Sequence, residues 1–246
     1  KIIKNAYKNK IKISSDIELF LSRLNEKNKN NLLLAVTGTN GKSTIALMIA
    51  RALKVNPLAN FGNPVLENFP TKNQKLVLEL SSFQLEYLDY IKPKVSIISN
   101  IKEDHISYHG SFKNYINSKI KICLHQKSKD FTVLNYDDQN IRKAFLKKDL
   151  SKAKVIWVSS QKKIKEGISY LGNILYDYYF AKKEYKIDKN IFLTHHHNKL
   201  NFVISYASLK CFNYESDKAI KVLKSFKGLP HRVEYIGRVN NIYFYN

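Results

Sequence analysis

The chain has 246 residues, 44% of them hydrophobic, which suffices for one large domain or two modest ones, and no apolar run is long enough to cross a bilayer. Its formal net charge is +22, but the lysines are spread over the whole length and Arg is rare, so we interpret the charge as a bias in residue usage rather than as the signature of a nucleic-acid partner. No apolar stretch follows the basic first ten residues, and the two cysteines lack metal-type spacing, so we expect a cytoplasmic protein with core thiols and no membrane insertion.

Short apolar runs alternate with helical patterns along the first two thirds of the chain. The apolar runs predict five buried strands, at Leu32–Val36, Leu76–Leu80, Val95–Ser99, Phe131–Leu134 and Val155–Val158. Helices are predicted between them, at Ser43–Leu53, Phe83–Leu88 and Phe112–His125. This alternation predicts an α/β fold, a mostly parallel sheet flanked by helices around a phosphate-loop type of nucleotide-binding core.

The pattern changes between Gly167 and Phe192, where Tyr and Ile recur at period two. Gly172-Asn173 and Lys182-Lys183 are turn candidates, which favours a small antiparallel patch at the edge of the sheet. Two helices are predicted after it, at Asn198–Phe212 and Ser216–Ser225. Gly228-Leu229-Pro230 then interrupts the chain, and a hairpin is predicted at Val233–Ile236 and Ile242–Tyr245.

The turn between the first predicted strand and its helix carries the most informative motif. Backbone N–H groups at a glycine-bearing turn, together with the helix dipole, favour a phosphate. Lys42 would reach the terminal phosphates, and the hydroxyl of Ser43 would bind Mg²⁺. The generic phosphate loop has glycine where this chain has Val36, so the match is to a variant form. The alternative is a solvated turn without a ligand.

Two later strands are also followed by chemistry-bearing side chains. Glu79 ends the second predicted strand, at the edge where α/β sheets bind ligands, and a carboxylate there suits Mg²⁺. The adjacent Ser81 or Ser82 would cap the next helix. Asp104 and His105 follow the third predicted strand, which indicates a metal ligand or a proton-transferring group.

Further polar residues lie on or near predicted helices. His195 to His197 are consecutive and so lack the spacing that would place metal ligands on one helical face. Asn198 and Asn201, three residues apart, share a face and could hydrogen-bond the edge of a ligand. From the sequence alone, Lys119 is one lysine among many, expected on a solvated helix face.

Together these strings resemble the Mur ligases, ATP-dependent amide-forming ligases of peptidoglycan assembly, from about Asp16 to Asn246. The strings that carry the resemblance are Gly38 to Thr44, Glu79 to Glu86 (ELSSFQLE), Asp104-His105, Tyr115 with Lys119, His197-Asn198 with Asn201, and Gly228 to Arg232 (GLPHR). ELSSFQLE and GLPHR are similar to the D-glutamate-adding members, whereas the lysine- or diaminopimelate-adding members typically have His at the position of Phe83.

The resemblance implies roles for individual residues. ATP would be bound by Gly38, Thr39, Asn40, Gly41, Lys42, Ser43, Thr44, Asn198, Asn201 and Arg232. The UDP-linked muramoyl precursor would be bound by Asn60, Ser81, Gln84 and His105. Two Mg²⁺ ions would be held by Ser43, Glu79, His105 and a carbamylated Lys119, and the catalytic set would be Lys42, Glu79, His105 and Lys119. Carbamylation would turn the Lys119 cation into an anion that suits a metal.

The resemblance also implies the reaction. The carboxylate of the muramoyl substrate would attack the γ-phosphate of ATP, and the amine of D-glutamate would then attack the resulting acyl phosphate. We expect a monomer with a linker remnant at residues 1–30, a central ATP-binding domain at 31–227 and the start of a third domain at 228–246, so the isolated chain would bind ATP without turnover. Left open are another Mur-type ligase, a folylpolyglutamate-type ligase, and a nucleotide- or nucleic-acid-binding module.

The chain departs from the family pattern in two strings. His195 stands where the family usually has glycine, two residues before the His of its His-Asn pair, which implies an altered adenine pocket. Ala59 and Phe61 replace the first glycine and the isoleucine of the usual Gly-Asn-Ile-Gly string.

Overall fold

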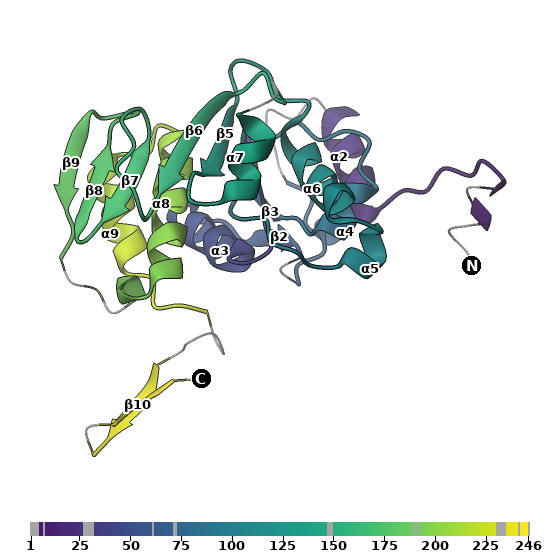
Figure 1. The fold of residues 1–246 in the computed structure, drawn as a ribbon. Helices are drawn as coiled ribbons and strands as arrows, with labels where there is room; N and C mark the ends of the chain where they lie inside the picture. Colours follow the sequence, from purple (N-terminus) through teal and green to yellow (C-terminus); the bar gives the residue numbers. More distant parts are fainter. Residues whose placement is uncertain are drawn as a thin grey trace.

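The computed structural model describes residues 5–6, 8–26, 32–60, 62–70, 73–146, 150–188, 190, 192–229, 235–240 and 242–245. Within these residues the main feature is a nine-stranded sheet with the order β2-β3-β1-β4-β5-β6-β7-β8-β9 (Figure 1). Its strands are β1 Leu32–Thr37, β2 Pro57–Ala59, β3 Lys75–Glu79, β4 Val95–Ile98, β5 Phe131–Asn135, β6 Lys154–Ser159, β7 Ile168–Leu171, β8 Ile174–Asp177 and β9 Lys183–Lys186.

The strands from β2 to β7 pair in parallel, and β8 and β9 pair antiparallel at one end. A separate two-stranded sheet is formed by β10 Tyr235–Val239 and β11 Ile242–Tyr245. This arrangement confirms the predicted α/β class, in which apolar strands alternate with helices that connect them.

Helices cover both faces of the sheet. One face carries α3 Lys42–Leu53, α8 His196–Lys210 and α9 Ser216–Lys224. The other carries α2 Asp16–Glu26, α4 Ser82–Glu86, α6 Phe112–Ile120 and α7 Gln139–Phe145. The short helix α5 Ile106–His109 precedes α6, and 3₁₀ turns occur at Val65–Glu67, Lys121–Cys123 and Phe192–Thr194.

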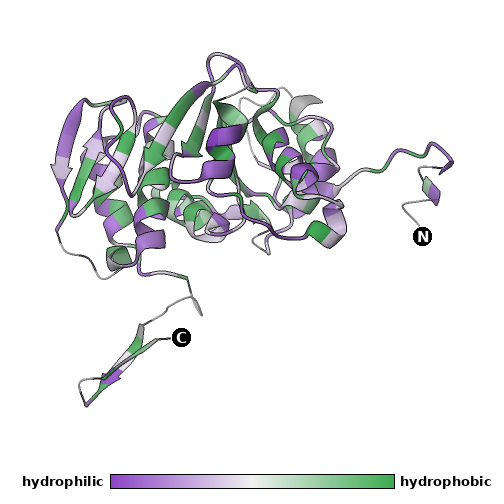
Figure 2. Cartoon of the chain, in the orientation of Figure 1, coloured by the Kyte–Doolittle hydropathy of each residue, from purple (hydrophilic) through white to green (hydrophobic). Residues whose placement is uncertain are grey.

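The interior strand β1 shows why two helical layers are needed. Leu34 and Val36 are fully buried in the core beneath α3 and α8, whereas Leu33 and Ala35 are buried in the core beneath α2, α4 and α6. Successive side chains of a strand point to opposite faces, so a continuous apolar run requires cover on both. Figure 2 shows hydrophobic residues along the strands and polar residues on outer helix surfaces.

Most predicted elements occur with small shifts in their bounds. All five predicted strands are present, and Cys123 and Cys211 are buried as expected. The predicted helix Phe112–His125 is too long, because α6 ends at Ile120 and the chain tightens into a 3₁₀ turn, as helix ends often do.

The antiparallel patch is present, with one turn displaced from its predicted position. Gly172 adopts a positive φ of 57° between β7 and β8, as its turn requires. Lys183 was expected in the second turn but begins β9, so that turn lies earlier, ending at Lys182 with φ 52°. In the final hairpin, Val233 and Glu234 lie outside the described residues.

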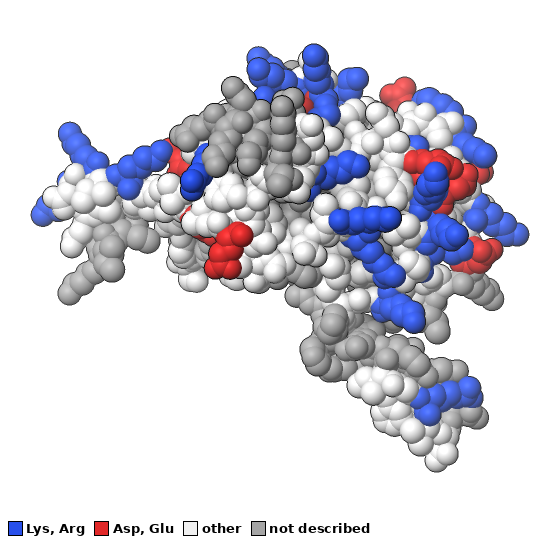
Figure 3. Space-filling model, turned by 180° about the vertical axis from the view of Figure 1, so that it is seen from behind, with Lys and Arg blue, Asp and Glu red and all other residues white. Residues whose placement is uncertain are grey.

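Two surface properties bear on the function classes. In the part of the chain that the structure describes, no helix combines the length and apolarity needed to span a membrane. On the face seen in Figure 3, Lys and Arg side chains lie in several separate places with Asp and Glu among them. The charge on this face is therefore spread rather than gathered into one stripe.

Candidate active site

Three neighbouring strands end at the same edge of the sheet, so the segments that follow them meet there. β1 pairs in parallel with β3, where Val36 lies opposite Glu79, and on its other side with β4. The loop at Gly38 to Thr44 is thereby flanked by Glu79 and by the segment Asn100 to His105. Ligands of open α/β sheets bind at this edge.

The loop after β1 is fastened to the end of β4. The backbone N–H of Thr39 donates to the carbonyl of Asn100 at 2.9 Å, and that of Asn40 donates to the Asn100 side chain at 2.8 Å. The carbonyl of Asn40 accepts from the side chains of Asn100 and Ser99, both at 2.8 Å. These contacts fix the path of the loop before any ligand arrives.

Two loop glycines stand where a side chain has no room. Gly41 has a φ of 82° immediately before α3, and a Cβ there would lie 2.7 Å from Oδ1 of Asn201. A Cβ on Gly38 would lie 2.0 Å from Oγ of Ser99. Gly41 has no side chain, so no N-cap side chain bonds to the start of α3, which is a position that favours an anion.

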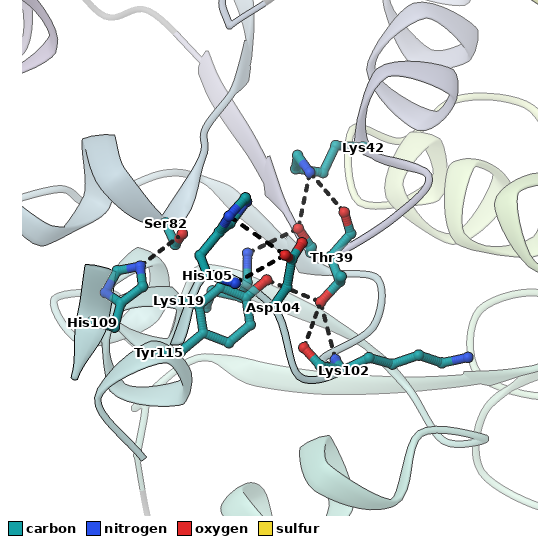
Figure 4. A network of polar contacts seen from close by, with 10 residues as sticks. Thr39, Lys42, Ser82, Lys102, Asp104, His105, His109, Tyr115 and Lys119 are labelled. Carbon is teal, nitrogen blue, oxygen red and sulfur yellow. Dashed lines mark hydrogen bonds and ion pairs between the residues drawn. The ribbon is translucent and has the colours of Figure 1, made fainter. Parts of the chain in front are cut away.

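Two lysines converge on this loop (Figure 4). Nζ of Lys42 donates to the carbonyls of Gly38 and Thr39, both at 3.0 Å. Nζ of Lys119, which comes from α6, donates to the same Gly38 carbonyl at 2.8 Å. One carbonyl oxygen therefore accepts from two side-chain amines that belong to different elements.

Lys119 is buried, so the expectation of a solvated helix face was wrong. Its exposed fraction is 1%, and its Nζ lies 4.6 Å from the centroid of the Tyr115 ring. Burial lowers the pKa of Lys119 to about 7, the positive charge of Lys42 acts in the same direction, and Asp104 opposes both. In a substantial fraction of molecules, Lys119 is then a neutral amine near neutral pH, which is the nucleophilic form.

Glu79 offers a buried carboxylate oxygen to the site. The residue is 1% exposed, and its Oε1 accepts from the Asn60 amide at 3.0 Å. Its Oε2 is buried and has no hydrogen-bond partner among the described residues. A buried oxygen of this kind is costly without a partner, and a hard divalent cation fits it. Ser43, in the first turn of α3, follows the neighbouring strand and adds a hydroxyl at the same edge.

His105 and Asp104 lie at the rim of the site and are partly exposed, with 47% and 43% of their side-chain surfaces accessible. His105 precedes α5 with a φ of 52°, and its ring centroid lies 4.8 Å from that of Phe83. The described residues contain no group of three His, Cys, Asp or Glu side chains placed for a metal ion.

Of the two serines predicted to cap the helix after β3, Ser81 is the N-cap of α4. Its Oγ accepts from the backbone N–H of Gln84 at 3.2 Å, and the Gln84 side chain accepts from the Ser81 backbone N–H at 3.0 Å, which forms a capping box. Ser82 is the first residue of the helix instead.

A cavity of about 230 Å³ lies between the loop and the start of α8. The side chain of Asn198 donates to the carbonyl of Phe192 at 2.9 Å, and Asn201 packs against Gly41. The residues around this cavity include Asn40, Gly41, Thr44, His197, Asn198 and Asn201. The predicted phosphate loop and the predicted asparagine pair thus border one space.

The three consecutive histidines are exposed, and one of them, His197, lines this cavity. The rings of His195 and His197 stack, with centroids 5.7 Å apart and an angle of 24° between their planes. His195, the residue that stands in place of the family glycine, is the N-cap of α8. Arg232, predicted to contact ATP, lies outside the described residues.

Sequence reasoning missed two residues that shape the site. Asn100 belonged to a predicted strand-end segment, but its hydrogen bonds to the loop depend on the β1–β4 pairing. His109 was not singled out, yet it is buried and contacts Ser82, which is 27 positions earlier in the chain. The one sequence signal for His109 was a histidine within a short segment that already contained His105.

Sequence comparison places this site in a known family. Residues 36–209 match the Mur ligase middle domain. The proteins named UDP-N-acetylmuramoylalanine--D-glutamate ligase from Rickettsia bellii and Rickettsia prowazekii are 37% and 38% identical over 251 and 252 residues. Each alignment covers 100% of this chain and 55% of the relative, so the chain spans about half the length of the curated relatives it matches.

Solved structures share the fold at lower identity. A UDP-N-acetylmuramoyl-L-alanyl-D-glutamate--2,6-diaminopimelate ligase superposes with a TM-score of 0.71 and 19% identity over 89% of this chain and 51% of that chain. The MurF ligase from Thermotoga maritima, solved in complex with ADP, superposes with a TM-score of 0.67 and 18% identity over 92% of this chain and 56% of that chain. With a family match over most of its length and the expected fold around the phosphate loop, the chain belongs to the Mur ligase family through its middle domain.

Proposed function

We propose that this chain is the ATP-binding part of a ligase that adds D-glutamate to UDP-N-acetylmuramoyl-L-alanine. The observation that carries the proposal is one sheet edge that joins the Lys42 loop to a buried carboxylate oxygen of Glu79 with no hydrogen-bond partner among the described residues. The relatives named as D-glutamate ligases support the choice of amino acid, and the ADP bound to the Thermotoga maritima protein supports the choice of nucleotide.

The cavity and the loop would bind different parts of the nucleotide. The base and ribose would lie in the cavity beside Asn198 and Asn201, while the phosphates would follow the loop to the start of α3. Lys42 would exchange its two loop carbonyls for the terminal phosphates and offset the charge of the transferring group.

The reaction has two steps, each a displacement. A carboxylate oxygen of the muramoyl substrate attacks the γ-phosphorus, the bond to the β-phosphate oxygen breaks, and ADP leaves behind an acyl phosphate. The amine of D-glutamate then attacks the acyl carbon, loses a proton, and inorganic phosphate leaves as the amide forms. Asn60, Ser81, Gln84 and His105 remain our candidates for holding the muramoyl substrate.

Divalent cations fit the donor set at this edge. We assign one Mg²⁺ to Ser43 and Glu79, and a second to His105 and a carbamylated Lys119. When bound, Mg²⁺ would neutralise phosphate charge and hold the phosphates in line for transfer. The neutral amine of Lys119 supports the modification, because it can attack CO₂, lose a proton and become a carbamate anion.

We keep the proposed boundaries of a central domain at residues 31–227, within which the family match falls. The chain spans 55% of the length of a D-glutamate ligase that it matches, and the complete reaction would also need what the remaining part of such a ligase supplies. The test of function therefore uses the complete gene product, with the 246-residue chain assayed beside it for ATP binding alone.

The experiment measures phosphate release with ATP, Mg²⁺, UDP-N-acetylmuramoyl-L-alanine and D-glutamate. We expect release to require all four, and replacing D-glutamate with L-glutamate, or the acceptor with a folate monoglutamate, should abolish it. Lys42→Ala should lower kcat/KM by about 10²- to 10³-fold, the usual effect of removing one group that stabilises transition-state charge. Lys113→Ala, an exposed lysine on α6, is the matched control. Turnover with the folate acceptor, or near-normal turnover of Lys42→Ala, would contradict the proposal.

A further inference from the structure

A polar cluster centred on the buried His109 lies beside the candidate site and has no part in the reaction as described. His109, whose side chain is 1% exposed, places Nε2 3.1 Å from Oγ of Ser82. Its other ring nitrogen, Nδ1, lies 3.1 Å from Oε2 of Glu86, an ion-pair distance, although the alignment is too poor for a hydrogen bond. Ser82 and Glu86 are the two ends of α4, so the ring lies close to both ends of the helix and is hydrogen-bonded to the first.

The surroundings of His109 favour the neutral form of its ring. Burial lowers its pKa, the positive charges of Lys119 and His105 act in the same direction, and Glu86 opposes them. A neutral imidazole has one N–H and one acceptor nitrogen. We assign the N–H to Nδ1, because it faces the Glu86 carboxylate, which leaves Nε2 to accept from the Ser82 hydroxyl.

The cluster connects the two strand ends that carry the proposed metal ligands. Glu79 lies three residues before Ser82, and His105 lies four residues before His109. The backbone N–H of His109 donates to the carbonyl of His105 at 3.1 Å. Thus the Ser82–His109 contact ties the turn after β3 to the turn after β4, with one candidate ligand on each side.

Phe83 makes a second path between the same two turns. Its ring stacks on His109 with a centroid distance of 5.7 Å and a 14° angle, and it contacts the ring of His105 at 4.8 Å. A movement of His109 would therefore reach the His105 ring through Phe83 as well as through the backbone. Ser82 itself is 2% exposed, which argues against a role as a nucleophile.

We propose that Ser82, His109 and Glu86 form a positioning clamp that sets the spacing between Glu79 and His105, and thereby the affinity of the site for divalent cations. The clamp rests on the proposed function, since it presumes that Glu79 and His105 bind cations. Residues that orient metal ligands from outside the coordination shell usually change metal affinity 10- to 100-fold when removed.

The experiment measures binding of Mn²⁺, as a paramagnetic substitute for Mg²⁺, to the complete protein in the presence of saturating ADP. Ser82→Ala removes the hydroxyl that meets the ring, and His109→Phe keeps an aromatic ring for stacking but removes both nitrogens. We expect each to raise the Mn²⁺ dissociation constant at least tenfold while ADP affinity without metal stays within twofold. His109→Gln, whose amide oxygen can accept from Ser82, should recover part of the Mn²⁺ affinity.

The matched control is Tyr87→Phe. The hydroxyls of Tyr87 and Tyr108 meet at 2.9 Å and also join α4 to α5, but on the exposed side. If any tie between these helices sufficed, Tyr87→Phe would weaken Mn²⁺ binding as much as Ser82→Ala; we expect a change below twofold. Thermal unfolding of each variant separates a general loss of stability from loss of the clamp, and Ser82→Ala covers the case in which His109→Phe does not fold.

The outcomes also separate the clamp from the function it rests on. Unchanged Mn²⁺ affinity in Ser82→Ala, or equal losses in Tyr87→Phe, would overturn the clamp and leave the ligase proposal standing. A wild type that binds Mn²⁺ with ADP but adds no D-glutamate would overturn the ligase proposal alone. Absence of ADP-dependent Mn²⁺ binding in the wild type would overturn both the metal assignment and the clamp.

Discussion

At the scale of single residues, the burial of Lys119 lowers the stability of the fold when its side chain is charged. Its pKa is about 7 in the folded chain against 10.5 for an ordinary lysine, chiefly because of burial. Between these two values the unfolded chain binds the proton and the folded chain does not, so the stability of the wild type rises as pH increases through this window. Below about pH 7 the penalty is fully present.

We therefore expect Lys119→Met, in CO₂-free buffer at pH 7, to have a higher free energy of unfolding than the wild type. The difference should be on the order of a few kcal/mol. The gap should shrink steadily as pH rises towards 10.5. Chemical denaturation at a series of pH values checks this, with Lys113→Met, an exposed residue of the same helix, as the control. A gap that is constant with pH would show that Lys119 is not a neutral amine.

The same variant tests the carbamate. With ¹³C-bicarbonate added, the wild type should give a carbamate carbon signal by NMR that is absent from Lys119→Met and present in Lys113→Met. A wild-type spectrum without that signal, recorded with ADP and Mg²⁺ present, would end the proposal that Lys119 is a metal ligand.

At the scale of elements, the turn between β1 and α3 depends on close approach as well as on backbone conformation. Gly41→Ala would strain a φ of 82° and also press a methyl group to 2.7 Å from Asn201. Gly172→Ala would strain a φ of 57° in the β7–β8 turn, where nothing lies within 4 Å. Comparing the two variants isolates the effect of the clash from that of the backbone.

We expect Gly172→Ala to cost about 1 kcal/mol of stability and to leave ADP binding unchanged. Gly41→Ala should lose more stability and weaken ADP binding at least tenfold, because Asn201 must move away from the cavity. Denaturation curves and ADP titrations of both variants give the answer. Equal effects on ADP affinity would mean that the packing against Asn201 is unimportant.

The elements also show what the sequence can and cannot predict. The five central strands were predictable because burial on both faces demands continuous apolar runs. β2 was not, since it has three residues, begins at Pro57 and is defined only by its pairing with β3. The helix α7 was overlooked although Asp138 gave a local signal, accepting from the N–H groups of Asn140 and Ile141 as an N-cap.

For the site, local motifs were predictable and contacts across the fold were not. The phosphate loop and Glu79 have signatures within a few residues, so their positions could be assigned from spacing. The burial of Lys119 depends on how α6 packs beside the loop after β1, 81 positions away in the chain. His109 acquires its partners only when the turns after β3 and β4 come together.

At the scale of the whole molecule, the net charge of +22 poses the question of nucleic-acid binding. Lys and Arg are spread over the face in Figure 3 with acidic groups among them, which favours weak and non-specific attraction. We expect DNA dissociation constants no tighter than the non-specific range of about 10⁻⁶–10⁻⁴ M at physiological salt, the same for different sequences. Titrations at several salt concentrations test this, and tight or sequence-dependent binding would favour the nucleic-acid alternative.

The ends of the nine-stranded sheet have a consequence for how the protein behaves in solution. An outermost strand presents unpaired backbone groups to which another chain can add a strand, the first step towards aggregation. At one border β9 carries exposed Lys183 and Lys186, whose charges oppose a second lysine-rich copy. At the other, β2 is only three residues long and starts with proline, which lacks the N–H donor. Both borders thus resist extension, so the sheet is expected to remain at nine strands even in concentrated solution.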